Sequence, residues 1–91
     1  MEKLTTSGRR IIEAESGGEV ILHGLNLVCK KPEKGFPPCT RKDLAWIAGQ
    51  GFNLLRLGVN WAAAEPEPGV YNRNYLSALR ALAGVAGELG L

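Results

Sequence analysis

The chain has 91 residues and a net charge of +2, and its 45% hydrophobic and 22% charged content is that of an ordinary soluble protein with enough apolar material for a core. No stretch approaches the roughly 18 to 20 consecutive apolar residues of a membrane span. The charged start has no apolar segment behind it, so no secretory signal is visible, which favours a cytoplasmic product or a chain whose leader has been removed.

The first elements expected along the chain are two short strands around a glycine turn. They cover residues 10–15 and 19–22, and the glycine pair between them supplies the positive φ that tight hairpin turns demand. Three prolines and a glycine then lie between residues 27 and 40, a composition that predicts a loop of functional length instead of regular structure.

A capping box predicts a helix over residues 41–50. Thr40 is followed three residues later by Asp43, so the hydroxyl can accept an orphan amide while the acid reaches back. Apolar residues fall at helical spacing at Leu44, Ile47 and Ala48. Gly51 supplies the left-handed residue that ends the helix, and a strand starts at Phe52. The order strand, loop, helix, strand predicts a parallel crossover unit.

A second helix is expected after a rigid, proline-containing turn at residues 65–69, with Asn72 as its cap. One apolar stripe runs along it, formed by Leu76, Leu79, Leu82, Ala83, Val85, Ala86 and Leu89. Gly90 is the expected stop.

The second strand carries an arginine in its middle. The run from Gly51 to Trp61 has apolar residues on both strand faces, which is typical of parallel strands covered on both sides. The sequence therefore predicts a strand buried on both faces. Packing alone does not favour a charged Arg56 there, so this residue indicates a functional site.

These residues resemble a known family. Residues 51–71 read Gly-Phe-Asn-x-x-Arg-Leu-Gly-Val-x-Trp-x-x-x-Glu-Pro-x-Pro-Gly-x-Tyr. The pattern is similar to the second strand and following loop of the cellulase-type glycoside hydrolases of family five, most of all their endoglycoceramidase and glucosylceramidase-like branch. Residues 20–26 resemble the family's first barrel strand, where Arg or His usually precedes Gly-x-Asn.

The resemblance implies an α/β fold, a partial TIM (β/α)8 barrel made of an N-terminal hairpin and the first two β/α units. A complete barrel typically needs about 250 residues. Residues 1–91 are therefore expected to form an incomplete glycoside hydrolase barrel domain, with the bottom hairpin at 10–22 and the two β/α units at 20–91.

The implied activity is that of a retaining O-glycosyl hydrolase acting on β-glycosides, with glycosphingolipids as one candidate substrate class. Such enzymes use one carboxylic acid and one carboxylate about 5 Å apart. In the family these are glutamates at the ends of the fourth and seventh strands, which these residues do not include. Glu33, Glu65 and Glu67 lie toward the correct face but are expected to be hydrated surface carboxylates, so no catalytic residue is assigned and the isolated chain is expected to be inactive.

Four residues are candidates for substrate binding or for support of the site. The resemblance implies that Arg56 hydrogen-bonds the nucleophilic glutamate and keeps it ionised, whereas pairing with another acid at the sheet rim is the alternative. It gives Lys30 a substrate contact and Asn26 a place at the site floor, although Lys30 also fits a solvated loop. Trp61 can stack on a sugar or cover the barrel rim. His23 is expected to be a core histidine.

Other classes of function and partner are also weighed. A small binding protein that uses its open sheet edges, by self-association or by joining a missing C-terminal barrel portion, is one alternative. The basic residues around the proline-rich loop lack a nucleic-acid motif, so no nucleic-acid partner is predicted. No cofactor or metal is expected, since one histidine and two cysteines give no zinc pattern. Cys29 and Cys39 are expected to be unpaired thiols, with a disulfide across the loop as the alternative.

Overall fold

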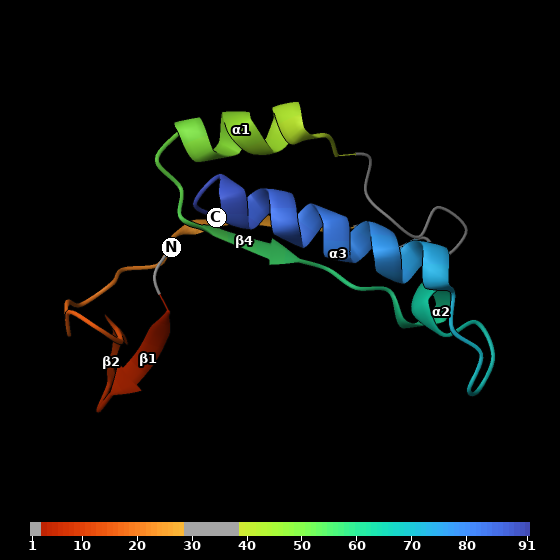
Figure 1. Ribbon diagram of the computed structural model, residues 1–91, viewed down its shortest axis with the longest axis horizontal. Helices are drawn as coiled ribbons and strands as arrows, with labels where there is room; N and C mark the ends of the chain where they lie inside the picture. Colours follow the sequence, from red (N-terminus) through yellow and green to blue (C-terminus); the bar gives the residue numbers. More distant parts are fainter. Residues whose placement is uncertain (1–2, 29–38) are drawn as a thin grey trace.

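The computed structural model describes residues 3–28 and 39–91, and the account that follows concerns these residues (Figure 1). Their elements in chain order are β1 (Leu4–Ser7), β2 (Arg10–Glu13), β3 (Gly24–Leu27), α1 (Arg41–Gly49), β4 (Leu54–Leu57), α2 (Trp61–Ala64) and α3 (Arg73–Glu88). β1 and β2 form an antiparallel hairpin, and β3 and β4 form a separate parallel pair. Figure 1 shows the hairpin standing off one end of the body that the two later strands and the helices make.

The hairpin pairs Leu4 with Glu13 at one end and Ser7 with Arg10 at the other. Gly8 makes the turn between the strands at a φ of 61°, a left-handed value that L side chains rarely adopt. The hairpin therefore has a tight two-residue turn. Its first strand, β1, lies nearer the N-terminus than the sequence indicated.

The predicted hairpin between residues 10–15 and 19–22 is confirmed only in part. The glycine turn itself exists, with Gly17 at a φ of 74°, but only one isolated antiparallel bridge, from Ile12 to Glu19, follows it. The amide of Val20 donates to the carbonyl of Ile11 at 2.8 Å, and the pairing goes no further before β3. β2 pairs along its length with β1 because residues 4–7 are extended and lie one tight turn away.

The core lies between the helices and one face of the parallel pair. Leu44 and Ile47 of α1 meet Leu82 and Ala86 of α3, and these four side chains are buried. Partly buried residues of the strands and their ends complete the cluster, among them Leu27, Phe52, Leu55 and Leu57. The strand, helix, strand, helix order predicted for residues 20–91 is confirmed, with α1 and α3 covering the same sheet face (Figure 1).

Both long helices begin as predicted. The Thr40 hydroxyl accepts from the amide of Asp43, and the Asp43 carboxylate accepts from the amide of Thr40 at 2.8 Å, which is the complete capping box. Gly51 follows α1 at a φ of 91°. The Asn72 side chain accepts from the amide of Tyr75 at 3.1 Å and caps α3. Gly90, at a φ of 82°, follows the end of that helix.

The apolar stripe of α3 is only partly correct. Leu82 and Ala86 are buried, but Leu76 is 40% exposed and Ala83 is exposed. Tyr75, which the stripe omitted, is buried, and its hydroxyl accepts a hydrogen bond from the amide of Asn60 at 3.0 Å. This bond ties α3 to the loop after β4, where the short helix α2 was also not predicted.

The prediction that the second strand is buried on both faces is wrong for the described residues. β4 alternates, with Leu55 and Leu57 half-buried against the helices, while Leu54 is 39% exposed and Arg56 is exposed. The reason is that the sheet has two strands and nothing among the described residues covers the face opposite the helices.

Asn53 joins the segment before β3 to the start of β4. Its side-chain Nδ2 donates to the carbonyl of Ile21 at 3.0 Å, and its Oδ1 accepts from the amide of His23 at 2.9 Å. Its own amide donates to the carbonyl of His23 at 3.1 Å. Three hydrogen bonds from one residue thus hold the two strands together at the end where both begin.

Candidate functional site

The uncovered face of the parallel pair brings two predicted site residues together. Asn26 of β3 is the register partner of Arg56 of β4, so their side chains leave the same sheet face next to each other. One pair earlier on that face are Gly24 and Leu54. Since strands alternate and Leu55 and Leu57 face the helices, Asn26 and Arg56 face away from them.

Gly24 allows the two strands to approach at this point. A Cβ added to it would lie 1.6 Å from the carbonyl oxygen of Leu54 and 2.5 Å from the carbonyl carbon. Only a residue without a side chain fits such an approach. The close approach of β4 therefore requires glycine at the first position of the Gly-x-Asn sequence in β3. The residue at its third position, Asn26, lies beside Arg56.

The Arg56 guanidinium has no carboxylate partner among the described residues. The ion pairs there are Arg10 with Glu19, at 4.0 Å, and Arg41 with Glu88. The alternative in which Arg56 pairs with an acid at the sheet rim thus finds no support in the described parts of the chain. Arg56 presents up to five N–H donors on an open face, next to an amide that can both donate and accept.

The loop after β4 forms a second cluster of polar and aromatic groups. Trp61, the first residue of α2, is 78% exposed, and its Nε1 donates to Glu65 Oε1 at 2.9 Å. The amide of Gly69 donates to Glu65 Oε2 at 3.1 Å. Hydrogen bonds from the Trp61 indole, the Gly69 amide and the Tyr71 hydroxyl hold the pKa of the Glu65 carboxyl below its usual range.

The expectations for this loop need two corrections. Trp61 does not pack on a rim in the described residues, because the indole is largely in solvent. Glu65 is not merely a hydrated surface carboxylate, since it receives hydrogen bonds from both ends of its loop. The four-residue spacing from Trp61 to Glu65, which is one helical turn, was the available signal for their contact.

Three other expectations have different outcomes. His23 is exposed and touches Phe52 edge-on, with ring centroids 5.6 Å apart, so the core histidine is wrong. Lys30, Glu33 and Cys29 lie outside the described residues, and what was expected of them stays a prediction. Cys39 is a free thiol packed at the edge of the core, and desolvation, followed by the Asp43 charge, raises its pKa.

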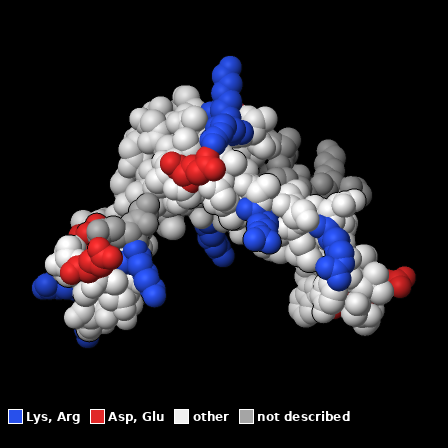
Figure 2. Space-filling view, in the orientation of Figure 1, with Lys and Arg blue, Asp and Glu red and all other residues white. Residues whose placement is uncertain are grey.

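The charges of the described residues do not gather in one place. Figure 2 shows lysine, arginine and acidic side chains of both signs over the hairpin and the helices of the visible face. The described residues hold no group of three or more His, Cys, Asp or Glu side chains placed to bind a metal ion. No helix in the described parts combines the length and apolarity that crossing a bilayer requires.

The solved structures to which this chain is similar carry the names of endoglycoceramidase-type enzymes. An endogalactoceramidase matches with a TM-score of 0.85 and 28% identity over 100% of this chain and 21% of its own. Endo-glycoceramidase II from Rhodococcus sp. in complex with ganglioside GM3 matches with a TM-score of 0.71 and 34% identity, over 84% of this chain and 18% of its own. Its lactosyl-enzyme intermediate matches with a TM-score of 0.70 and 35% identity over the same shares. No family model and no curated protein matches the sequence.

The fold is a partial TIM barrel. The chain spans about a fifth of the length of the structures it matches. In this partial barrel, the uncovered face of β3 and β4 is the one that turns toward the barrel axis, because the helices of a TIM barrel form its outer ring. The carboxyl ends of β3 and β4 lie at the face where such barrels carry their chemistry.

Proposed function

We propose that these residues form the N-terminal part of a retaining β-glycosidase that acts on glycolipid or other β-glycoside substrates. The observation that carries the proposal is the Asn26 and Arg56 pair on the axis-facing side of two parallel strands, in a fold matched by endoglycoceramidases. The lactosyl-enzyme form of one such enzyme fits a double-displacement reaction, in which a carboxylate becomes glycosylated and water then releases the sugar.

Within this proposal Arg56 is a positioning residue for the nucleophilic carboxylate. A fixed cation close to a carboxylate lowers its pKa by about 1 to 3 units, which keeps the nucleophile ionised at lower pH. Asn26, beside it, would donate or accept at the floor of the site. Lys30 and Trp61 would contact substrate from the loops after β3 and β4. The catalytic acid and nucleophile belong to later strands of the barrel, so the 91 residues alone are proposed to be inactive.

The first test is an activity assay of the 91-residue chain. With aryl β-glucosides and glucosylceramide as substrates we expect no turnover. Among the described acids near the correct face, Glu65 is the one whose carboxylate accepts hydrogen bonds from both ends of its loop, so it is the residue to check. A measurable rate that Glu65→Gln abolishes would overturn the proposal that catalysis needs later strands.

The second test completes the barrel. The 91 residues replace the matching segment of the Rhodococcus sp. endoglycoceramidase, and folding of the chimera is checked by thermal unfolding. We expect activity, and we expect Arg56→Gln to move the acidic limb of the kcat/KM profile up by about 1 to 3 pH units, because the nucleophile loses its cation. Arg80→Gln, on α3, is the control and should leave the profile unchanged. A folded chimera without activity, or an unmoved limb in Arg56→Gln, argues against the assignment.

A second candidate function is that of a binding fragment that holds a barrel portion on another chain. The observation in its favour is an apolar groove of about 180 Å³ between β4 and α3, lined by Leu55, Leu57, Leu82, Ala83, Ala86 and Leu91. β4 pairs only with β3 among the described strands, so its other edge has backbone groups available there. Sedimentation at increasing concentration separates self-association from a monomer that melts cooperatively, and the latter counts against binding as the function.

A further inference from the structure

The loop after β4 carries two exposed aromatic side chains, of which Trp61 is held in place by a hydrogen bond. Trp61 is 78% exposed and Tyr71 is 56% exposed. An exposed indole usually moves among rotamers, but here its N–H is bonded to Glu65 at 2.9 Å. The Tyr71 hydroxyl also acts on this carboxylate, as the smallest contribution to its lowered pKa. Glu65 thus fixes the polar end of the Trp61 indole, and the apolar surfaces of both rings remain largely in solvent.

The backbone around this acid is itself tightly connected. The amide of Gly69 donates to Glu65 Oε2 at 3.1 Å, and the amide of Asn72 donates to the carbonyl of Ala64 at 2.9 Å. Glu67 and Val70 form an isolated bridge between Glu65 and Asn72. The Asn60 side chain caps α2 by accepting from the amide of Ala63 at 3.1 Å. The rings are therefore presented by a frame that is organised before any ligand binds.

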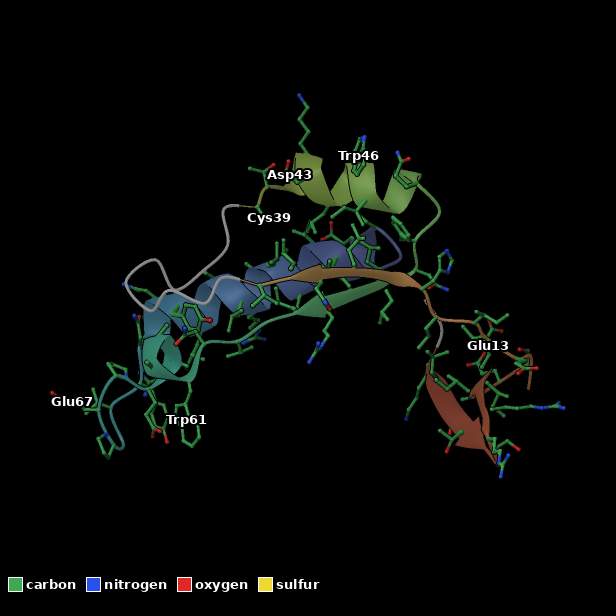
Figure 3. The ribbon with its side chains drawn as sticks, turned by 180° about the vertical axis from the view of Figure 1, so that it is seen from behind. Glu13, Cys39, Asp43, Trp46, Trp61 and Glu67 are labelled. Carbon is green, nitrogen blue, oxygen red and sulfur yellow. The ribbon has the colours of Figure 1, made fainter. Side chains whose placement is uncertain are left out.

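The position of the rings relates them to the proposed site. Figure 3 shows the Trp61 side chain projecting from α2 on the side of the molecule away from α1. The uncovered face of β3 and β4 also turns away from α1, because α1 packs on the other face. Trp61, Asn26 and Arg56 therefore belong to one side of the partial barrel.

We propose that Trp61 and Tyr71 form a platform for a pyranose ring and that Glu65 is the positioning residue that holds it. The negative face of an aromatic ring attracts the polarised C–H groups on the apolar face of a sugar. The remaining acceptor capacity of the Glu65 carboxylate suits a sugar hydroxyl, which is a donor. The ligand class is a β-linked glucosyl or galactosyl disaccharide, so the inference rests on the proposed function and adds a defined contact surface to it.

A sugar fits this platform better than a lipid surface does. The hydrogen bonds to Glu65 lower its pKa, so the carboxyl is charged at neutral pH. A charged carboxylate bonded to the Trp61 indole opposes insertion of this ring into hydrocarbon, because an ionised group is costly to transfer there. A sugar hydroxyl can instead hydrogen-bond that same charge.

The test uses the two tryptophans of the chain as probe and control. Trp46, on α1, is 63% exposed and gives the second indole N–H signal in a proton–nitrogen NMR spectrum. Lactose and cellobiose are titrated into the labelled 91-residue chain. We expect the Trp61 indole signal to shift with saturation and the Trp46 signal to stay in place. An unmoved Trp61 signal at tens of millimolar sugar, or equal shifts of both signals, overturns the proposal.

Variants separate the roles of ring and acid. Trp61→Ala should abolish the saturable binding, and Trp46→Ala should leave it unchanged. Glu65→Ala should weaken binding about tenfold and increase the mobility of the Trp61 indole in nitrogen relaxation, with the unfolding midpoint as a check on the fold. Glu65→Gln keeps an oxygen acceptor and should recover part of the affinity. Equal affinity in Glu65→Ala and the unchanged chain refutes the positioning role.

Three outcomes separate this inference from a membrane contact and from the proposed function. Phosphatidylcholine vesicles that broaden the Trp61 signal, when both disaccharides leave it unmoved, would replace the sugar platform with a membrane contact. Sugar binding needs no turnover, so an inactive but folded chimera together with saturable binding would refute the glycosidase and keep the platform. An active chimera without sugar binding to Trp61 would refute the platform and keep the glycosidase.

Discussion

The same chemical change at two glycines should affect stability in opposite directions. Gly24→Ala puts a Cβ 1.6 Å from the Leu54 carbonyl oxygen, and since real Cβ atoms essentially never come within 3.0 Å, the strands must separate by about 1.4 Å (3.0 minus 1.6). Overpacking that moves backbone costs about 1 to 3 kcal/mol. Gly84 lies inside α3 with nothing within 4 Å of the added Cβ, so Gly84→Ala should stabilise by about 0.8 to 1.0 kcal/mol.

Thermal and urea unfolding followed by far-UV circular dichroism measure both effects. For a domain of this size 1 kcal/mol corresponds to about 4 to 8 °C in Tm. Gly84→Ala should therefore raise Tm by several degrees, and Gly24→Ala should lower it by at least as much. In Gly24→Ala the amide of Leu55 should also exchange faster, because it lies in the parallel pair that is forced apart. If Gly24→Ala melts at or above the unchanged chain, the close approach of β3 and β4 is not as described.

Three further predictions concern the core, a helix cap and the contact between α3 and the loop after β4. Leu44→Ala removes a fully buried side chain and should cost about 2 to 5 kcal/mol in urea unfolding. Backbone and then side-chain hydrogen bonds from Thr40 lower the pKa of Asp43, so the folded-state pKa lies below the unfolded one. The stabilisation that the Asp43 carboxylate gives is complete above its ordinary pKa of 3.8 and is lost as the pH falls through its folded-state pKa. The difference in Tm between the unchanged chain and Asp43→Asn should therefore be largest at neutral pH and disappear in strong acid. Tyr75→Phe removes the acceptor of the Asn60 amide, should cost about 1 kcal/mol, and should speed hydrogen exchange at that amide.

Each of these has a result that would contradict it. Leu76→Ala, at a position 40% exposed on α3, is the control for the core and should change stability by less than about 1 kcal/mol. A Leu44→Ala cost no larger than that would mean the core is not centred on α1. A Tm gap between the unchanged chain and Asp43→Asn that persists in strong acid would remove the carboxylate from the cap. Unchanged exchange at Asn60 in Tyr75→Phe would show that the amide is protected by another group.

The parts of the fold that the sequence predicted correctly depend on neighbouring residues. The capping box of Thr40 and Asp43, the Asn72 cap and the positive φ of Gly51 all act within one turn of backbone. The order strand, loop, helix, strand predicted the parallel topology, and the resemblance of residues 51–71 to family five predicted the partial barrel, which solved structures of the same fold support. Short-range chemistry and a long motif were thus sufficient for β3, α1, β4 and α3.

The parts that were missed depend on distant partners. Leu4–Ser7 is an ordinary short segment whose pairing with β2 no local pattern announces. The apolar residues on both faces of β4 predicted burial on both sides, but burial depends on how many strands and layers are present, and the described residues supply one layer. The two hydrogen bonds to Glu65, from Trp61 and Gly69, need the return of the chain at Gly69, which an analysis of each acid by itself does not reveal.

The hydrogen bonds of Asn53 have a consequence for the guanidinium of β4. A parallel pair that slips by one residue sends every side chain of the slipped strand to the opposite surface. Such a slip would bring Arg56 among the leucines beneath the helices and would expose Leu55 and Leu57 in its place. By binding Ile21 and His23 before the sheet begins, one carboxamide fixes the alignment of residues thirty positions apart. The side of the sheet on which the positive charge emerges is therefore decided outside the strand that carries it.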